Sequence, residues 1–299
     1  MTGSLPPRWP GGARSAVVVT VDFNDIHDIV AREPATEGRE KTLSVWRYGA
    51  RRGVDRVLDA LDDHAVRASW FVPGRVAEAH RGLVRQIHAA GHELATNGYR
   101  CEIFDGLSLA EQQDAFVRGR AALADAVGEA PVGFRSASGN WAPGFAQVLS
   151  AAGIRWSSSW RGDDLPYFHA PRDAAAFVEL PLHYELEDEP YFAFNLYPPV
   201  PPGQSRIAGY RDVLANWRQD FAGFHRYGLC YLLRLHPEMI GTTGRIELLR
   251  DLLGGLRQHP DVWFATGREV ADWWASTQPP NAPDHPAEVF ARVLAERRS

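Results

Sequence analysis

Two polar residues stand at the ends of predicted buried strands, and their side chains would suit acid–base chemistry. Asp22 follows the apolar, β-branched run at 17–21, and His236 follows the predicted strand at 229–235. A carboxylate in that position is partly desolvated, which raises its pKa and makes it a usable general base. A histidine there suits a general acid. Taken alone, Asp22 is equally consistent with a helix cap or a salt bridge, and an isolated histidine is more often a core residue.

Arg135 is the last residue of another predicted strand, at 132–135. Its guanidinium could orient Asp22 through a bidentate ion pair or hold a substrate carboxylate. A purely structural salt bridge is as consistent with this residue alone. Together, an aspartate base and a histidine acid would direct water onto an amide and protonate the leaving nitrogen.

Further polar and aromatic residues follow other strands and are candidates for a substrate pocket. The thiol of Cys101 could be a nucleophile if Arg100 lowered its pKa, but it has no paired base, so a small pocket-lining residue is the better interpretation. The tryptophans, which we place in loops, could be packing residues, and the loop carboxylates could be caps. The candidate substrate-binding residues are Asn24, Asn97, Cys101, Trp46, Trp141, Trp160, Asp163, Asp164 and Tyr167.

Eight short apolar runs predict strands, and helical patterns lie between them. The strands are expected at 16–23, 68–72, 93–97, 132–135, 154–159, 177–182, 229–235 and 262–265. The helices are expected at 52–64, 75–90, 108–127, 143–152, 208–227, 244–258, 267–275 and 286–298. This alternation predicts an α/β fold, either a (β/α) barrel or a doubly wound sheet. Reactive groups at many strand ends favour the barrel, and no Gly-x-Gly-x-x-Gly turn follows the first strand.

Composition excludes several classes of protein. The 299 residues are 45% hydrophobic with a net charge of -5, so neither disorder nor a nucleic-acid partner is expected. Two cysteines are too few for a disulfide-rich scaffold, and we expect both to be reduced. No signal peptide and no apolar run of about 18 residues is found, so we expect no membrane association and a cytoplasmic location. We expect a flexible segment at 1–14, a single domain at 15–278, and a tail with a short helix at 279–299.

Several segments together resemble the polysaccharide deacetylase (NodB-homology) family, carbohydrate esterase family 4. The resemblance is greatest to the branch with intracellular peptidoglycan deacetylase-like proteins, cyclic imidases and the metal-independent allantoinase. It covers roughly residues 15–275 and implies a distorted (β/α)7 barrel. The segments are Val-Asp-Phe-Asn at 21–24, Tyr-Gly-Ala-Arg at 48–51, 68–74, 90–99, Gly-Phe-Arg at 133–135, 163–167, Glu-Leu-Pro at 179–181, 189–192 and Leu-His-Pro at 235–237.

The resemblance assigns Asp22 to the family's catalytic base, His236 to its acid and Arg135 to the arginine that braces the base. The family's usual metal ligands are an aspartate two residues after the base and a His-x-x-x-His pair. These positions hold Asn24, Asn97 and Cys101 in this chain. Two amides and one thiol are a poor zinc set, so we expect no catalytic metal and no other cofactor. Neighbouring side chains could rebuild a site, which is the less favoured alternative: Asp25, His27, Asp28 and Glu102.

The sequence therefore predicts a metal-independent hydrolase of a non-peptide C–N bond in a small cyclic amide, imide or ureide. Asn24 and Asn97 would help to stabilise the oxyanion. Three alternatives stay open: an isomerase or lyase that uses the same acid and base, a metal-dependent polysaccharide deacetylase, and a non-catalytic binding protein. The expected partner is a small-molecule substrate, and the family branch leaves a homo-oligomer open.

Overall fold

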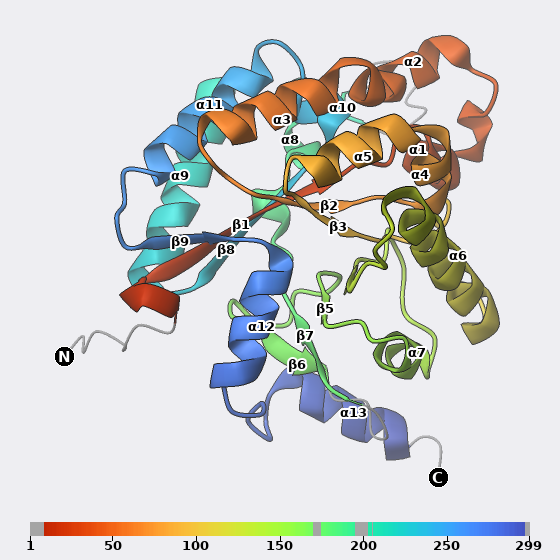
Figure 1. The fold of residues 1–299 in the computed structure, drawn as a ribbon, viewed down its shortest axis with the longest axis vertical. Coiled ribbons are helices and arrows are strands. Elements are labelled where there is room, and N and C mark those ends of the chain that lie inside the picture. Colours follow the sequence, from red (N-terminus) through yellow and green to blue (C-terminus); the bar gives the residue numbers. More distant parts are fainter. Residues whose placement is uncertain (1–8, 170–174, 195–202, 205, 297–299) are drawn as a thin grey trace.

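The computed structural model describes residues 9–169, 175–194, 203–204 and 206–296 (Figure 1). The strands are β1 (Ser15–Asp22), β2 (Ser69–Phe71), β3 (Glu93–Ala95), β4 (Gly133–Phe134), β5 (Trp156–Ser157), β6 (Tyr167–His169), β7 (Phe177–Glu179), β8 (Cys230–Leu235) and β9 (Val262–Ala265). The α-helices are α1 (His27–Arg32), α2 (Glu40–Tyr48), α3 (Val54–Asp63), α4 (Gly74–Ala79), α5 (Arg81–Ala89), α6 (Leu109–Val127), α7 (Phe145–Ala151), α8 (Glu189–Phe192), α9 (Tyr210–Tyr227), α10 (Pro237–Ile240), α11 (Arg245–Leu256), α12 (Gly267–Thr277) and α13 (Pro286–Glu296).

The strands form two sheets that are joined by single bridges. The first sheet has the order β3-β2-β1-β8, with β9 paired to the start of β1, and the second has the order β4-β5-β7-β6. A parallel bridge between Thr96 and Phe134 links β3 to β4, and one between Glu187 and Arg234 links the segment after β7 to β8. Parallel pairings and these two bridges thus connect seven strands in the order β8-β1-β2-β3-β4-β5-β7, as in a distorted (β/α)7 arrangement, and the segment after β7 makes the last link. The eighth predicted strand, β9, pairs only with β1, and β6 is antiparallel to β7.

The strand β1 has one face toward the helices and one toward the interior, because side chains alternate along a strand. Val17, Val19 and Val21 belong to a large hydrophobic core that they form with residues of α3, α5, α9 and α11. These four helices cover the first sheet in Figure 1. On the opposite face, Thr20 and Asp22 both contact a guanidinium that comes from the end of β4. The alternation therefore carries Asp22 into the interior at the C-terminal end of the strand.

The predicted helices are found with small changes at their ends. The capping box that opens α6 is present, because Ser108 Oγ accepts a hydrogen bond from Glu111 N and the Glu111 carboxylate accepts one from Ser108 N. The helix predicted at 75–90 is two helices, α4 and α5, which are separated at His80. His80 has a non-helical ψ of 38° and its Nε2 lies 2.9 Å from Asp25 Oδ2, so this contact coincides with the break.

Several short elements were not predicted, because an element of only a few residues is too short to show a clear hydrophobic periodicity. They are the strand β6 and the helices α1, α2, α8 and α10. The longest of them, α2, contains nine residues and buries only Leu43 and Trp46. A short helix with so small an apolar face is hard to distinguish from a loop in the sequence.

Both ends of the described chain contact the domain. Trp9 is 2% exposed and its ring lies 5.8 Å from that of Trp274 in α12. The helix α13 lies beside the second sheet (Figure 1), where Phe290 contacts Trp160 at 5.9 Å. Residues 1–8 of the segment that we expected to be flexible lie outside the described residues, and the domain limits stay a prediction.

Within the described residues, no helix combines the length and the apolar character needed to cross a membrane. Cys101 and Cys230 are both buried and free.

Candidate active site

Two arginines hold the carboxylate of Asp22 at the end of β1. Arg135 Nη1 donates to Asp22 Oδ1 at 2.5 Å, and Arg234 Nε donates to Asp22 Oδ2 at 2.8 Å. Arg135 is fully buried and also donates through Nε to the carbonyl of Ser158 at 2.8 Å. Its complete burial leaves no surface for a substrate carboxylate, so Arg135 is placed to brace Asp22. Arg234 faces Thr20 in the register of β1 and β8, which brings it to the same interior face.

These arginines reverse the expected pKa shift of Asp22. Burial alone raises the pKa of this carboxyl, as we expected from the sequence. The charges of Arg135 and Arg234 lower it more strongly, so that the pKa falls from 3.8 to about 2. The expectation of a raised pKa was wrong because it took account of desolvation and not of a second arginine. Asp22 is therefore a weak proton acceptor in the free protein.

Asp188 keeps the imidazole of His236 protonated. His236 Nδ1 donates to Asp188 Oδ1 at 2.7 Å, and the backbone N–H of His236 donates to Asp188 Oδ2 at 2.9 Å. Burial lowers the pKa of His236, but the charge and hydrogen bond of Asp188 raise it to about 10. His236 is thus an oriented imidazolium whose Nε2 is free to face a reactant.

A second carboxylate, that of Glu187, also lies near His236 Nε2. Glu187 Oε1 lies 4.0 Å from His236 Nε2, and Asp22 Oδ2 lies 3.9 Å from the same nitrogen. Arg234 connects the two carboxylates, because its Nη1 lies 2.9 Å from Glu187 Oε1. Burial raises the pKa of Glu187, and the charges of Arg234 and His236 only partly oppose this. Glu187 is therefore a stronger proton acceptor than Asp22.

Asn24 and Asn97 meet beyond the C-terminal ends of β1 and β3, the two strands on either side of β2. Asn97 Nδ2 donates to Asn24 Oδ1 at 2.7 Å, and both residues are 2% exposed. Within the described residues, Asn97 Oδ1 is buried and accepts no hydrogen bond. The structure thus brings together the two amides that we predicted and leaves one buried acceptor unused.

Cys101 lies near these groups but is not an activated thiol. It is 1% exposed and has a φ of 57°. Burial, followed by the negative charges of Asp28 and Glu102, holds the pKa of the thiol well above its usual value. The idea that Arg100 lowers this pKa was wrong, since the Arg100 guanidinium lies over the ring of Tyr99, 5.8 Å from its centroid. Cys101 remains a candidate for lining the pocket.

The three tryptophans predicted near the site occupy different places. Trp46 is in the helix α2 and not in a loop, and it packs with Ile29 and Leu43. Trp141 and Trp160 contact each other edge to face at 5.5 Å beside the second sheet. Their geometry supports packing as the first role of all three.

The remaining candidates lie in the loop before β6 and in β6 itself. Asp163 Oδ1 accepts hydrogen bonds from the backbone of Asp164 and Leu165, and its Oδ2 lies 3.3 Å from His285 Nε2. Tyr167 is buried against the ring of His285 at 4.8 Å. These contacts connect the loop to the C-terminal tail, and a direct role in substrate binding stays a prediction.

Sequence reasoning missed Arg234, Glu187 and Asp188. Arg234 had a usable signal, because it shares a strand face with Leu232 and His236 at a spacing of two residues. Glu187 and Asp188 have no comparable signal in the sequence, because they come from an irregular segment. This segment reaches β8 through the bridge between Glu187 and Arg234.

Comparisons with known proteins show the family to which this chain belongs. The family model described as polysaccharide deacetylase matches residues 39–157. A solved structure titled "putative polysaccharide deacetylase from Mycobacterium smegmatis" is 30% identical, and the match covers 96% of this chain and 99% of that one with a TM-score of 0.87. The chain belongs to the polysaccharide deacetylase family. The predicted family and fold, and the predicted enzyme class of hydrolases of non-peptide C–N bonds, are thereby confirmed.

Two further relatives extend this comparison. A peptidoglycan deacetylase from Helicobacter pylori is 21% identical over 263 residues, which are 79% of this chain and 88% of the relative. The crystal structure of Puue allantoinase is 20% identical, covers 94% of this chain and 96% of its own, and has a TM-score of 0.80. At that identity the second likeness shows a shared fold.

The residues at the metal-ligand positions of the polysaccharide deacetylase family do not fit a metal in this chain. The amide oxygen of Asn24 is used by Asn97, and the thiol of Cys101 is held protonated. The neighbouring carboxylates that could rebuild a site are engaged elsewhere. Asp25 contacts His80, Asp28 contacts Arg32, and Glu102 accepts hydrogen bonds from two backbone N–H groups.

A second group of metal-binding side chains, Glu187, Glu189 and His236, has ligand atoms within 4.8 Å of one another. Its members are also occupied, because Glu187 pairs with Arg234, Glu189 pairs with Arg32 at 2.6 Å, and His236 is protonated. A protonated imidazole offers no lone pair to a cation. We therefore derive no catalytic step through a metal.

Proposed function

We propose that this chain is a cytoplasmic hydrolase that opens a non-peptide C–N bond in a small cyclic amide, imide or ureide without a catalytic metal. One observation carries the proposal. The Nε2 atom of the oriented imidazolium of His236 lies close to two carboxylates, 3.9 Å from Asp22 and 4.0 Å from Glu187. A proton donor and a proton acceptor are therefore close enough to act on one small substrate.

His236 acts as the general acid in this proposal. Because Asp188 raises its pKa to about 10, the imidazole carries its proton throughout the neutral range. Its Nε2–H protonates the leaving nitrogen as the C–N bond breaks. Asp188 is a positioning residue that fixes the ring and favours the charged form.

Glu187 takes the proton from the attacking water, the role that we expected for Asp22 from the sequence. The water oxygen bonds to the substrate carbonyl carbon, and the water proton passes to Glu187. The carbonyl then re-forms, the C–N bond breaks and the nitrogen leaves with the proton of His236. The proton held on Glu187 returns to His236, so the cycle closes without another reactant. Asp22 fixes Arg135 and Arg234 around this centre.

Positive and polar groups of the chain supply the stabilisation that a metal would otherwise give. The Arg234 side chain is 15% exposed and bears a positive charge beside the two carboxylates, where it can face a developing oxyanion. The unused acceptor Asn97 Oδ1 suits an N–H group, which cyclic imides and ureides carry. An imide is also more activated than a simple amide, because two carbonyls share one nitrogen, and a strained ring would add to this activation. The allantoinase among the structural neighbours supports a cyclic ureide as one candidate.

The test uses tag-free protein that has been treated with a chelator and then assayed against cyclic imides, hydantoins and allantoin. We expect turnover that persists without metal, incorporation of one oxygen-18 atom from labelled water, and a loss of about 10³-fold or more in His236→Gln. His183→Gln is the matched control, because His183 is also 3% exposed and lies in the segment after β7.

Other outcomes would replace this proposal with one of the alternatives. Activity that disappears on chelation and returns with zinc would indicate a metal-dependent deacetylase. Turnover without oxygen-18 incorporation would indicate an isomerase or lyase. If the protein bound these compounds and converted none of them, a non-catalytic binding protein would be favoured.

A further inference from the structure

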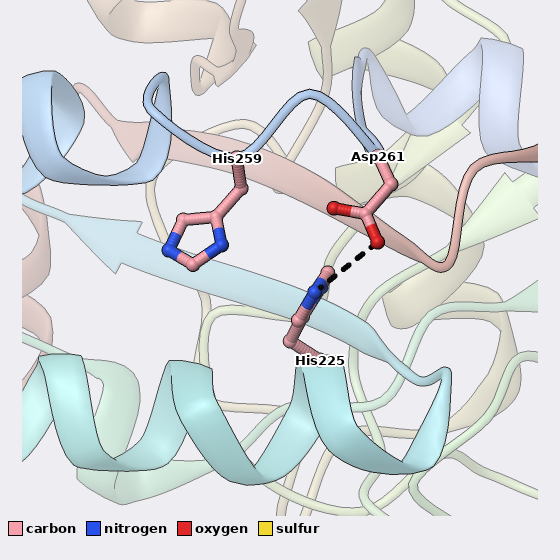
Figure 2. Close-up of side chains that lie close together, drawn as sticks. All are labelled: His225, His259 and Asp261. Carbon is pink, nitrogen blue, oxygen red and sulfur yellow. Dashed lines mark ion pairs between the residues drawn. The ribbon is translucent and has the colours of Figure 1, made fainter.

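A second group of reactive side chains lies at the opposite end of β1 from Asp22. His225 comes from the last turn of α9, and His259 and Asp261 come from the loop between α11 and β9 (Figure 2). One candidate ligand atom from each residue lies within 4.8 Å of the other two. We propose that these three residues bind a divalent transition-metal ion of the zinc type, separately from the acid–base site.

The spacing of two of these ligand atoms already suits a shared ion. Asp261 Oδ2 lies 3.5 Å from His225 Nε2. In a tetrahedral zinc site, with bonds of about 2.0–2.2 Å, two such atoms are about 3.3–3.6 Å apart. Figure 2 shows the Asp261 carboxylate directed toward His225, with the His259 ring beside them. His259 is exposed, so its ring can turn by the amount that coordination requires.

His225 is held in the orientation that a metal ligand needs. Its Nδ1 shares a hydrogen bond of 2.9 Å with Ser15 Oγ, and Ser15 is fully buried at the start of β1. A histidine that ligates through one ring nitrogen usually donates its other N–H to an oxygen in this way. The ring of His225 is also stacked on Phe221 at 5.4 Å, while His259 contacts the same ring at 5.0 Å. One phenyl ring thus supports both imidazoles.

The backbone fixes the third ligand next to this pair. The N–H of Arg14 donates to the carbonyl of Asp261 at 2.7 Å, which ties the loop to the residue before β1. The guanidinium of Arg14 is turned to the end of α9, where its Nε donates to the carbonyl of His225 at 2.9 Å. The carbonyls at a helix C-terminus carry partial negative charge, which offsets part of the positive charge of Arg14.

The proposed site has an open side. A cavity of about 920 Å³ is lined by His225 and His259 together with Arg14, Arg218 and Arg250. An ion held by three protein ligands would face this cavity, and water or an anion drawn by the arginines would complete its coordination. Two imidazoles and one carboxylate favour zinc, cobalt or nickel over magnesium or calcium, which prefer oxygen ligands. The ion would join α9, the start of β1 and the loop before β9.

The experiment is calorimetric titration of tag-free, chelator-treated full-length protein with zinc chloride, with magnesium chloride in parallel. We expect one zinc per chain, no binding of magnesium, and at least a tenfold loss of zinc affinity in His259→Ala, whose exposed position makes misfolding a minor concern. His64→Ala is the matched control, because His64 lines the same cavity and is outside the cluster. Ser15→Ala should weaken binding by about tenfold through the orientation of His225.

Two results would overturn the proposal. One is the absence of stoichiometric zinc binding in the wild-type protein. The other is unchanged zinc affinity in the double variant His225→Ala/His259→Ala, which would place the bound ion elsewhere. Neither result depends on enzymatic activity, so neither affects the proposed hydrolase.

Discussion

Two buried carboxylates at strand ends, Asp22 in the first sheet and Glu179 in the second, are held in different ways. Asp22 has two guanidinium partners, and the imidazolium of His236 lies 3.9 Å away. Glu179 accepts hydrogen bonds from the backbone of Ser159 and Trp160 and lies 3.2 Å from His169 Nε2. The Asp22 carboxylate thus belongs to a network of buried charges, whereas the Glu179 carboxylate is held mainly by neutral backbone N–H groups.

The difference shows what turns a strand end into a site. In the first sheet, the parallel register of β1 and β8 brings Arg234 and His236 to the level of Asp22, and Glu187 enters from the segment after β7. Several buried charges of both signs then lie close together. In the second sheet, Glu179 accepts hydrogen bonds from the backbone of Ser159 and Trp160, and the rings of Trp141, Trp160 and His169 pack together. A carboxylate at the end of a strand is therefore a weak indicator until its neighbours are known.

The largest expected effect comes from Asp188→Asn, which keeps the shape of the side chain and removes its charge. Without that charge the pKa of His236 falls from about 10 toward its ordinary value of 6.5, and the ring loses its orientation. We expect kcat to fall by about 10³-fold at neutral pH, and the fall of activity on the basic side of the pH profile to shift to lower pH.

The pH dependence of protein stability should also reveal the loss of the Asp188 charge. His236 has a raised pKa in the folded protein, so its contribution to stability is complete below pH 6.5 and is lost as the pH rises to about 10. This dependence, measured by urea unfolding between pH 6 and 10, should be much smaller in Asp188→Asn. An unchanged pH profile in both assays would mean that Asp188 does not control the proton of His236.

The next effect tests which carboxylate accepts the proton of water. Because the pKa of Glu187 is raised above 4.5 and that of Asp22 is about 2, kcat/KM should fall on the acid side above pH 4.5 and not near pH 2. Glu187→Gln should lower kcat by about 10²-fold and remove this acid limb. Glu189→Gln is the control, because Glu189 is close in sequence but pairs with Arg32. An acid limb that survives in Glu187→Gln would return the role of base to Asp22.

The sequence was sufficient for most of the longer elements and for the residues at the ends of regular strands. Asp22, Arg135 and His236 follow apolar runs, and the side-chain alternation of a strand is enough to place them on one interior face. The same rule would have found Arg234. Asn24 and Asn97 meet as the convergence of parallel strand ends would require, with Asn97 Nδ2 donating to Asn24 Oδ1, and their role in substrate binding stays a prediction.

The partners that decide the charge state could not be predicted in the same way. Asp188 and Glu187 come from an irregular segment whose path depends on tertiary packing. Without them the pKa of His236 has no determinable direction, and the pKa shift of Asp22 was assigned the wrong sign because the charges of Arg135 and Arg234 were not weighed against burial. Tertiary packing also decided that Trp46 lies in a helix and that the helix predicted at 75–90 breaks at His80.

In the second sheet, Glu179→Gln should affect stability and leave catalysis intact. The amide weakens the hydrogen bonds from the backbone of Ser159 and Trp160 and the contact with His169, at a cost of about 1–3 kcal/mol in the free energy of unfolding. Urea unfolding measures that loss, and kcat should stay within a factor of two of the wild-type value. A loss of kcat comparable to that of Glu187→Gln would show that the two strand ends act as one site.

The smallest expected effect is that of Asp163→Ala in the loop before β6. Asp163 is exposed and caps the backbone of Asp164 and Leu165, so we expect a change of at most about 0.5 kcal/mol in the free energy of unfolding. The contact with His285 predicts a local consequence, namely faster proteolysis of the C-terminal tail without a change in kcat. If KM instead rises tenfold while stability is unchanged, this loop binds substrate, and the pocket extends from the charged end of the first sheet to the second.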